Sequence, residues 1–420
     1  MRLLPFALVC AAAMAGCGNG ALAPGSGTAP MTTADAGSDA ADRASDLASS
    51  DLPAAPDVAD VASSDQSMVP DAAATPEVGA TDVPPGRVPY RAIAMSIGEA
   101  HVCVILDDHK VKCWGINDEG QLGLGDTRTR GSNPSDMGDN LPTVDLGTGR
   151  TAKAISARVY TTCALLDDDS VKCWGDWWSV AFPDGTLIGD KPGEMGDNLA
   201  PLDLGVGRKA TSVVLGEATR CVTTNDRSAL CWGDSVLEPK PVTLPSGTTI
   251  VGLALGYDAF GLLSDGSISS VFEDPPRSLA FALDPGTRAR ALFAAYSNVC
   301  ATLDTGGLKC WILNVQNPPG VVPPPTNDAD VEAVAFSMTG GVSLLTKSGA
   351  VESANGFTGA RHLVQPGRPA VAVEGAQTGF CALLDDGSVK CWGATAAWMG
   401  GSDQNAPSWP AVNLGTRPAP

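Results

Sequence analysis

The chain repeats a segment of about 40 residues, and no other feature of the sequence constrains its fold as strongly. Ala154–Gly175 and Ala372–Gly393 align without a gap, 218 residues apart. Weaker copies bring the total to seven, in which the first cysteine or its replacement stands at 103, 163, 221, 260, 300, about 342 and 381. The steps between these positions are 60, 58, 39, 40, 42 and 39 residues, so the first two copies carry insertions. A fixed period in this range predicts one supersecondary unit per repeat, buried only by its neighbours.

Each unit has the pattern of four short strands, as in Ala92–Ser96, Val102–Leu106, Val111–Trp114 and Thr143–Leu146. Four antiparallel strands per unit describe a propeller blade, and seven blades can close a ring. We therefore predict an all-β, seven-bladed β-propeller, with a linear β-solenoid as the alternative. The segment Ala411–Gly415 repeats the fourth-strand pattern, and we expect it to pair beside Ala92–Ser96 and close the ring.

The N-terminus has the pattern of an export signal. The apolar run Leu3–Ala15 ends in Ala15-Gly16-Cys17, which resembles the bacterial lipobox, so residues 1–17 predict a lipoprotein-type signal peptide with Cys17 as the lipidation site. Gly18 lacks the aspartate that favours retention in the inner membrane. We expect an outer-membrane lipoprotein of the bacterial cell envelope, and ordinary cleavage with secretion is the alternative.

Residues 18–88 separate this signal from the repeats. They consist mainly of Ala, Asp, Ser, Pro, Thr and Val and contain no Trp or Phe, so they lack the apolar surface that a core needs. This composition predicts a disordered linker, with the propeller occupying residues 89–420. The formal net charge of the whole chain is -20, which disfavours nucleic acid and anionic lipid as partners.

Ten cysteines in the repeats form five pairs with one spacing. A three-residue turn centred between the two cysteines places them directly opposite each other, within reach of a disulfide. The third turn position requires a left-handed backbone; it is Gly at 266, 306 and 387, and His109, Asp169 and Arg227 elsewhere. Free thiols and zinc ligation are weaker alternatives, because the chain is exported and the spacing is not that of zinc ligands. The predicted disulfides are Cys103–Cys113, Cys163–Cys173, Cys221–Cys231, Cys300–Cys310 and Cys381–Cys391.

The recurring Val-Lys-Cys-Trp-Gly strings and the segment Asn117–Thr127 resemble the regulator of chromosome condensation repeat, in its bacterial, exported, Cys-containing branch. Members of that family form seven-bladed propellers. Its founding members are exchange factors for a small GTPase on chromatin, a role that acidity, export and disulfides oppose here. Other bacterial members resemble protein-binding modules, including an exported inhibitor of β-lactamases.

Because successive strands run up and down, the first-to-second and third-to-fourth loops of every blade should open on one face. The insertions Gly120–Asn140 and Asp176–Asn198 belong to this face, and aromatic residues in rigid loops are typical anchors for protein partners. These side chains could instead pack onto their own loops. The candidate binding residues are His101, Tyr160, Trp177, Trp178, Tyr257, Tyr296 and Trp398.

These features favour a monomeric, membrane-anchored protein-binding scaffold with an unidentified protein partner. A structural cell-surface protein without a dedicated ligand is the first alternative, and an extracytoplasmic enzyme the second. The sequence shows no Ser-His-Asp set, no HExxH motif and no P-loop, so we expect no catalytic residues, no cofactor and no metal. Calcium at the Asp-rich turn Asp167–Asp169 is a minor alternative, since Asp is also a common turn residue.

Overall fold

The structure is a computed structural model that describes residues 83–176, 187–233, 236–271, 281–313, 320–322, 330–356, 361–364, 366–393 and 411–419. Cys17, the signal peptide and nearly all of the predicted linker lie outside these residues. The described part is all-β, with three short 3-10 helices: η1 (Pro134–Asp136), η2 (Gly138–Asn140) and η3 (Gly196–Asn198). No helix in it is both long and apolar enough to cross a membrane.

Seven antiparallel sheets of three or four strands follow one another along the described chain, and we number them sheets 1 to 7. Sheets 3, 5 and 6 have the four strands that the repeat predicts, and sheets 1, 2, 4 and 7 have three within the described ranges. The strands are β2 (Ala92–Ile97), β3 (His101–Leu106) and β4 (Val111–Gly115) in sheet 1; β5 (Ala152–Arg158), β6 (Thr161–Leu166) and β7 (Val171–Gly175) in sheet 2; β8 (Ala210–Leu215), β9 (Thr219–Thr224), β10 (Ala229–Gly233) and β11 (Val236–Pro241) in sheet 3; β12 (Ile250–Leu255), β13 (Ala259–Leu263) and β14 (Ile268–Ser270) in sheet 4; β15 (Ala289–Ala295), β16 (Asn298–Leu303), β17 (Leu308–Ile312) and β18 (Gly320–Val322) in sheet 5; β19 (Val331–Phe336), β20 (Gly341–Thr346), β21 (Val351–Asn355) and β22 (Arg361–Val364) in sheet 6; and β23 (Ala370–Gly375), β24 (Gly379–Leu384) and β25 (Val389–Gly393) in sheet 7.

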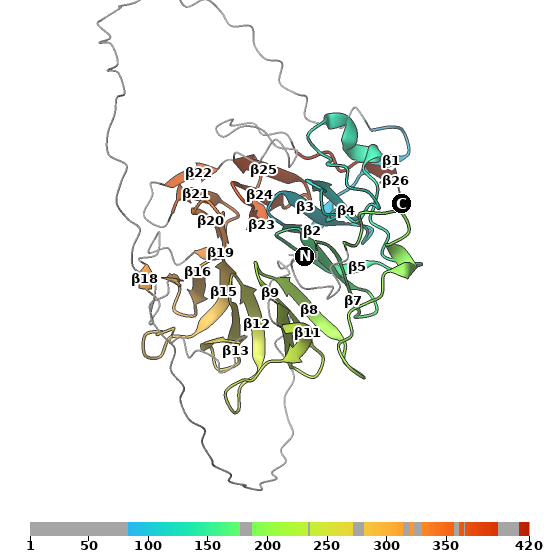
Figure 1. The fold of residues 1–420 in the computed structure, drawn as a ribbon. Helices are drawn as coiled ribbons and strands as arrows, with labels where there is room; N and C mark the ends of the chain where they lie inside the picture. Colours follow the sequence, from blue (N-terminus) through green and yellow to red (C-terminus); the bar gives the residue numbers. More distant parts are fainter. Residues whose placement is uncertain are drawn as a thin grey trace, which may run out of the picture. The chain divides into compact units, whose positions relative to one another are not determined.

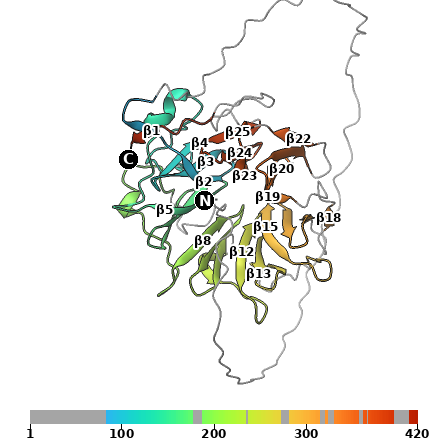
Figure 2. The ribbon, with the colours of Figure 1, turned by 180° about the vertical axis from the view of Figure 1, so that it is seen from behind.

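The first strand of each sheet contacts the first strand of the next. This series runs β2, β5, β8, β12, β15, β19, β23 and returns to β2, so the contacts form a closed cycle (Figures 1 and 2). The first strands are therefore the innermost elements. A linear solenoid would leave β23 and β2 apart, so the closed cycle contradicts that alternative.

Apolar side chains fill the spaces between neighbouring sheets. Ile105 and Val111 of sheet 1 pack with Leu166 and Trp174 of sheet 2, and every one of them is at most 1 % exposed. Sheets 7 and 1 share a cluster of the same kind. Each sheet is thus buried on both faces, which explains why its middle strand is a continuous apolar run instead of an alternating one.

The turn between the second and third strands has the predicted left-handed third residue. Its φ is 62° at His109, 69° at Asp169 and 67° at Arg227, and 82° to 86° at the glycines 266, 306 and 387. This conformation directs the carbonyl oxygen toward the neighbouring sheet. His109 O accepts from Ala152 N at 3.0 Å, and Gly387 O accepts from Ala92 N at 2.8 Å.

The five predicted disulfides are confirmed, with Cα–Cα distances of 4.0 to 4.1 Å between directly opposed residues. The fourth and sixth hairpins, which have lost both cysteines, differ from each other. Phe260 faces Ser270 in the fourth, as the spacing predicts. In the sixth, the cysteine positions are Ser343 and Ser353, not Val342, and the two hydroxyls hydrogen-bond to each other. Disulfides form in oxidising compartments, so five of them indicate an extracytoplasmic protein.

The predicted pairing of Ala411–Gly415 beside Ala92–Ser96 is wrong. Val412 N instead donates to Val389 O at 2.8 Å, so this segment lies on the outer edge of sheet 7. The connection to sheet 1 is made by the next residues, where β26 (Thr416–Pro418) pairs with β1 (Arg87–Pro89). The free edge of β2 faces the centre, which an outer segment cannot reach. Because β1 begins at Arg87, one described strand starts inside the predicted linker, residues 18–88.

Thr143–Leu146 is the corresponding outer segment of sheet 1. It is not a regular strand, and Val144 N donates a single hydrogen bond to Val111 O at 2.8 Å. Its side chains are nonetheless part of the core, since Val144 and Leu146 are 5 % and 4 % exposed.

Candidate functional site

The turns between the first and second strands, which we call the first turns, meet on one face of the described structure. The chain that leaves the third strand lies on the same face. Ile116 N donates to Ala100 O at 2.8 Å in sheet 1, and Asp176 N donates to Tyr160 O at 3.0 Å in sheet 2. For these two sheets, the predicted sharing of a face by the two kinds of loop is confirmed.

Backbone hydrogen bonds join the first turns of neighbouring sheets, and we call the joined set the turn ring. A backbone held on both sides in this way presents its side chains in a fixed position. The bonds run from Glu99 N to Val159 O, Glu217 N to Gly256 O, Tyr257 N to Tyr296 O, Met338 N to Ala376 O and Gln377 N to Glu99 O, at 3.0 to 3.4 Å.

Tyr257 is the most exposed of the predicted binding residues in the described chain, with 50 % of its surface accessible. It lies edge-on to Tyr296, with ring centroids 6.2 Å apart. Tyr296 is only 8 % exposed, and burial raises the pKa of its hydroxyl. Tyr296 therefore packs against the ring of Tyr257 and supports it, and it is too buried to act as an anchor itself.

Charged side chains hold Tyr296 in place. The Arg158 guanidinium lies over its ring, 4.8 Å from Cζ to the centroid, and Arg158 Nε donates to Glu217 Oε1 at 3.0 Å. The same Glu217 oxygen accepts from Tyr296 N at 3.1 Å. Sheets 2, 3 and 5 thus meet through one cation, one carboxylate and one ring. Tyr296 and Val159 both have positive φ values, 56° and 49°, so the local backbone is strained to allow this arrangement.

Tyr160 is half-buried in an acidic part of the face. Burial and the negative charges of Glu99, Glu119 and Asp176 raise the pKa of its hydroxyl. The pKa of Glu119 is itself raised, by burial and by Asp176 and other neighbouring acids. The surface around Tyr160 is therefore negatively charged and suited to contacts with basic groups.

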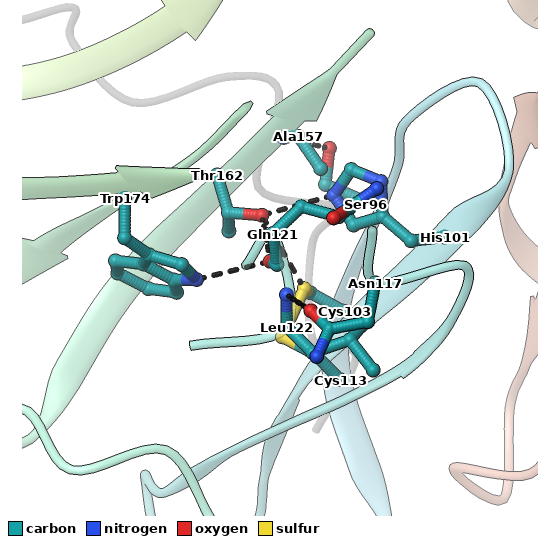
Figure 3. Close-up of a disulfide and its surroundings, with 10 residues drawn as sticks. All are labelled: Ser96, His101, Cys103, Cys113, Asn117, Gln121, Leu122, Ala157, Thr162 and Trp174. Atoms are coloured by element: carbon teal, nitrogen blue, oxygen red, sulfur yellow. Dashed lines mark hydrogen bonds between the residues drawn. A yellow bond between two sulfur atoms is a disulfide. The ribbon is translucent and has the colours of Figure 1, made fainter. Parts of the chain in front are cut away.

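His101 is not an exposed anchor, which contradicts its predicted role. It belongs to β3 and is 0 % exposed, and Figure 3 shows its ring turned toward Thr162 of sheet 2. Thr162 Oγ1 donates its proton to Gln121 O at 2.9 Å, so it must accept from His101 Nε2, also at 2.9 Å. Burial lowers the pKa of the imidazole to about 3. His101 is thus a neutral link between sheets 1 and 2, which residue type alone could not distinguish from a loop histidine.

The first insertion is largely a packed structure and not a free binding loop. Leu122 is 0 % exposed, and Gln121 O accepts a hydrogen bond from Trp174 Nε1 of sheet 2 at 3.0 Å (Figure 3). Gly125 N donates to Gly189 O of the second insertion at 2.9 Å. The two insertions therefore support each other. Trp177, Trp178 and Trp398 lie outside the described residues.

The Asp-rich turn of sheet 2 is occupied by cations from the protein itself. Arg150 pairs with Asp168 at 2.7 Å, and Lys153 pairs with Asp169 at 2.5 Å. These contacts weaken the calcium alternative. Across the described residues there is no group of three or more His, Cys, Asp or Glu side chains that could hold a metal ion.

Sheet 1 and the start of the first insertion match a family model. Residues 92–121 match the model of the regulator of chromosome condensation (RCC1) repeat. The chain carries this repeat. The matched residues span β2 to β4 and end at Gln121. The carbonyl oxygen of Gln121 accepts hydrogen bonds from Trp174 Nε1 and Thr162 Oγ1 of the next sheet. No curated protein sequence matches the chain.

Solved structures with a similar fold include several propellers. The CRINKLY WD40 ectodomain of the receptor kinase ACR4 from Arabidopsis thaliana is 15 % identical, with a TM-score of 0.49 over 73 % of this chain and 96 % of that one. Prp20p from Saccharomyces cerevisiae is 14 % identical, with a TM-score of 0.40 over 76 % of each chain. The β-propeller domain of Cps50 (Swd1) from Myceliophteria thermophila is 10 % identical, with a TM-score of 0.48 over 73 % of this chain and 98 % of that one.

Proposed function

We propose that the protein is an exported, membrane-anchored scaffold whose seven-bladed propeller binds a partner protein through the turn ring. The observation that carries this proposal is Tyr257, a half-exposed aromatic side chain on a backbone held by its neighbours. Exposed aromatic residues on rigid supports contribute much of the binding energy in protein interfaces, because little side-chain entropy is lost when they are covered.

Other features of the same face support the proposal. Met338 on the first turn of sheet 6 is 47 % exposed, and Tyr160 is half-buried among acidic groups. An aromatic, a methionine and a negatively charged surface together suit a partner with apolar and basic side chains.

Export and anchoring are supported by the N-terminal sequence and the disulfides. Lipidation of Cys17 would attach the chain to a membrane, and the linker would separate the propeller from it. A flexible segment of about 70 residues has a root-mean-square reach of roughly 45 to 50 Å. The turn ring would then be free to meet a partner at a distance from the membrane.

Site-specific photo-crosslinking in the cells that produce the protein tests the binding surface. A benzoylphenylalanine is placed at position 257, and the control is placed at position 206. Val206 is fully exposed but follows the outer segment of sheet 2, away from the first turns. We expect a discrete adduct from position 257 that position 206 does not give. Equal labelling from both positions, or no adduct from either, would contradict a dedicated partner and favour a structural surface protein.

The Cys17→Ser variant tests the anchor. If Cys17 carries lipid, the variant should leave the membrane fraction, lose metabolic labelling with a fatty acid and retain its disulfides. Unchanged fractionation and mobility would show that Cys17 carries no lipid anchor, and the binding proposal would then depend on the crosslinking result alone.

A further inference from the structure

Three contacts between innermost strands are made in the same way. In each, a side chain on the first strand of one sheet accepts a hydrogen bond from the backbone of the next sheet. Ser96 Oγ accepts from Ala157 N at 3.0 Å, Ser156 Oγ accepts from Leu215 N at 3.0 Å, and Glu374 Oε2 accepts from Ile97 N at 2.8 Å. We call the contact between the first strands of two neighbouring sheets a seam.

The three side chains occupy one position of the repeat. Each faces the first cysteine of its own hairpin, so Ser96 is opposite Cys103, Ser156 is opposite Cys163, and Glu374 is opposite Cys381. The other four sheets have side chains without a hydrogen-bond acceptor at this position: Val214, Ala254, Phe293 and Ala335.

Glu374 is therefore the ionisable member of this set, and it lies at the seam that joins sheet 7 to sheet 1. Glu374 and Ile97, which this hydrogen bond joins, are 277 positions apart in the chain. All other seams join sheets that follow each other directly. The sheet 7 to sheet 1 seam closes the cycle and so has the weakest covalent support.

The surroundings of Glu374 contain few compensating charges. From β2 it meets Ile97 N and the Ser96 hydroxyl, and on β24 it faces Cys381, which is disulfide-bonded. The positive charge of Arg158 on β5 lowers the pKa of Glu374, but Arg158 already pairs with Glu217. Burial dominates these attractive contacts and raises the pKa of Glu374 to about 7.

We propose that the sheet 7 to sheet 1 seam is an acid-stabilised closure of the propeller, tightened when Glu374 is protonated and loosened when it ionises. An uncharged carboxyl keeps its acceptor oxygen for Ile97 N and can be covered by the two sheets at little cost. Glu374 is only partly exposed in the closed seam. An ionised carboxylate there is incompletely hydrated and its nearest cation is already engaged, so opening the seam lets it regain full hydration.

The direction of the pH dependence follows from proton binding. The closed seam binds the proton of Glu374 more tightly than an open or unfolded seam, in which the pKa is near its ordinary value of 4.5. Closure is therefore favoured at low pH and weakens as the pH rises between 4.5 and about 7. Above that window Glu374 is ionised in both forms and causes no further change.

Hydrogen exchange of the oxidised full-length protein at pH 5 and pH 8 tests the proposal, after correction for intrinsic exchange rates. Peptides covering residues 92–97 and 370–376 report the sheet 7 to sheet 1 seam. Peptides covering 152–158 and 210–215 report the seam of Ser156, which has the same geometry without an ionisable group. Protection at the first pair should fall about tenfold more than at the second pair between the two pH values.

Two variants provide the controls. Glu374→Gln keeps an acceptor oxygen without the charge, and Glu374→Ser converts the position to the side chain that sheets 1 and 2 use. Both should remove the excess pH dependence. If either folded variant retains it, or if the wild-type protein shows equal changes at both seams, the proposal is wrong. If both variants fail to fold, the comparison of the Glu374 seam with the Ser156 seam in the wild-type protein still tests the proposal.

Discussion

At the residue scale, backbone conformation explains several positions that side-chain chemistry does not. The third residue of each tight turn adopts a left-handed conformation whether it is Gly, His, Asp or Arg. At His109, Asp169, Gly266 and Gly387 the carbonyl oxygen of this residue accepts a hydrogen bond from the first strand of the next sheet. The strain at His109 and Asp169 is therefore compensated by a contact between sheets, since His109 O accepts from Ala152 N and Asp169 O accepts from Ala210 N.

Replacing Gly387 by Ala tests this explanation. Gly387 has a φ of +83°, and a Cβ atom there would lie 2.6 Å from Arg91 Cβ and 3.0 Å from Ala92 O. Gly149 is the matched control, because its φ is +71° and a Cβ atom would have no neighbour within 4 Å. We expect Gly149→Ala to cost about 1 kcal/mol of unfolding free energy and Gly387→Ala about 2 to 3 kcal/mol in urea titrations. Equal costs would show that the close approach to sheet 1 is unimportant.

His101 should make the fold sensitive to acid. Its pKa is about 3 in the folded protein and near 6.5 when unfolded, so the unfolded chain binds an extra proton between these values and stability falls as the pH is lowered from 6.5. His101→Gln removes the titrating group and keeps a donor for Thr162. The difference in unfolding free energy between wild type and variant should shrink by about 2 to 3 kcal/mol from pH 7.5 to 4.5. A constant difference would mean that the imidazole is accessible to protons in the folded state.

At the element scale, a repeated lysine joins each insertion to the preceding sheet. Lys112 Nζ donates to Gly138 O and Leu414 O, both at 2.8 Å. Lys172 Nζ makes the equivalent bonds to Gly196 O at 2.8 Å and to Leu146 O at 3.1 Å. The insertions thus have a structural role in addition to any contribution to the binding face.

Lys172→Met should therefore destabilise the protein. Lys172 is 7 % exposed, and its loss would leave two carbonyl oxygens short of a donor, at a cost of about 2 kcal/mol. Lys153→Met is the control, since the Lys153 side chain is 43 % exposed and pairs with Asp169 on the surface. The control should change the unfolding free energy by less than about 0.5 kcal/mol, measured by thermal unfolding at the wild-type midpoint. Similar effects of the two variants would contradict the role assigned to Lys172.

At the scale of the whole molecule, stability depends on joining sheet 7 to sheet 1. Val412 and Leu414 are 6 % and 4 % exposed in the apolar cluster that these sheets share. Arg417 Nη2 pairs with Asp107 of sheet 1 at 2.7 Å, beside the pairing of β26 with β1. The residues after 410 thus contribute apolar contacts, an ion pair and a small sheet to one junction.

Truncation after residue 410 should lower the melting temperature by roughly 10 °C, because two buried aliphatic side chains and the acceptor of Lys112 are lost together. Removal of residues 18–80, whose composition predicts no packed core, should change it by no more than about 2 °C. Differential scanning calorimetry of the two shortened proteins makes the comparison. A truncated protein that melts like the full-length protein would exclude this junction as a source of stability.

The sequence by itself determined the repeat, its strands, the tight turns and the disulfide pairs. The strands, turns and disulfide pairs depend on residues within about ten positions of one another, and the repeat is found by comparing segments of the sequence, so spacing and turn chemistry are sufficient to predict them. The roles of His101, the insertions and Ala411–Gly415 depended on contacts between sheets. A histidine beside a turn has the same sequence pattern whether it points to solvent or to Thr162 of the next sheet. The meeting of Arg158, Glu217 and Tyr296 and the position of Glu374 at the closing seam were likewise decided by the tertiary structure, because side chains from distant repeats become neighbours only when the sheets pack around a common centre.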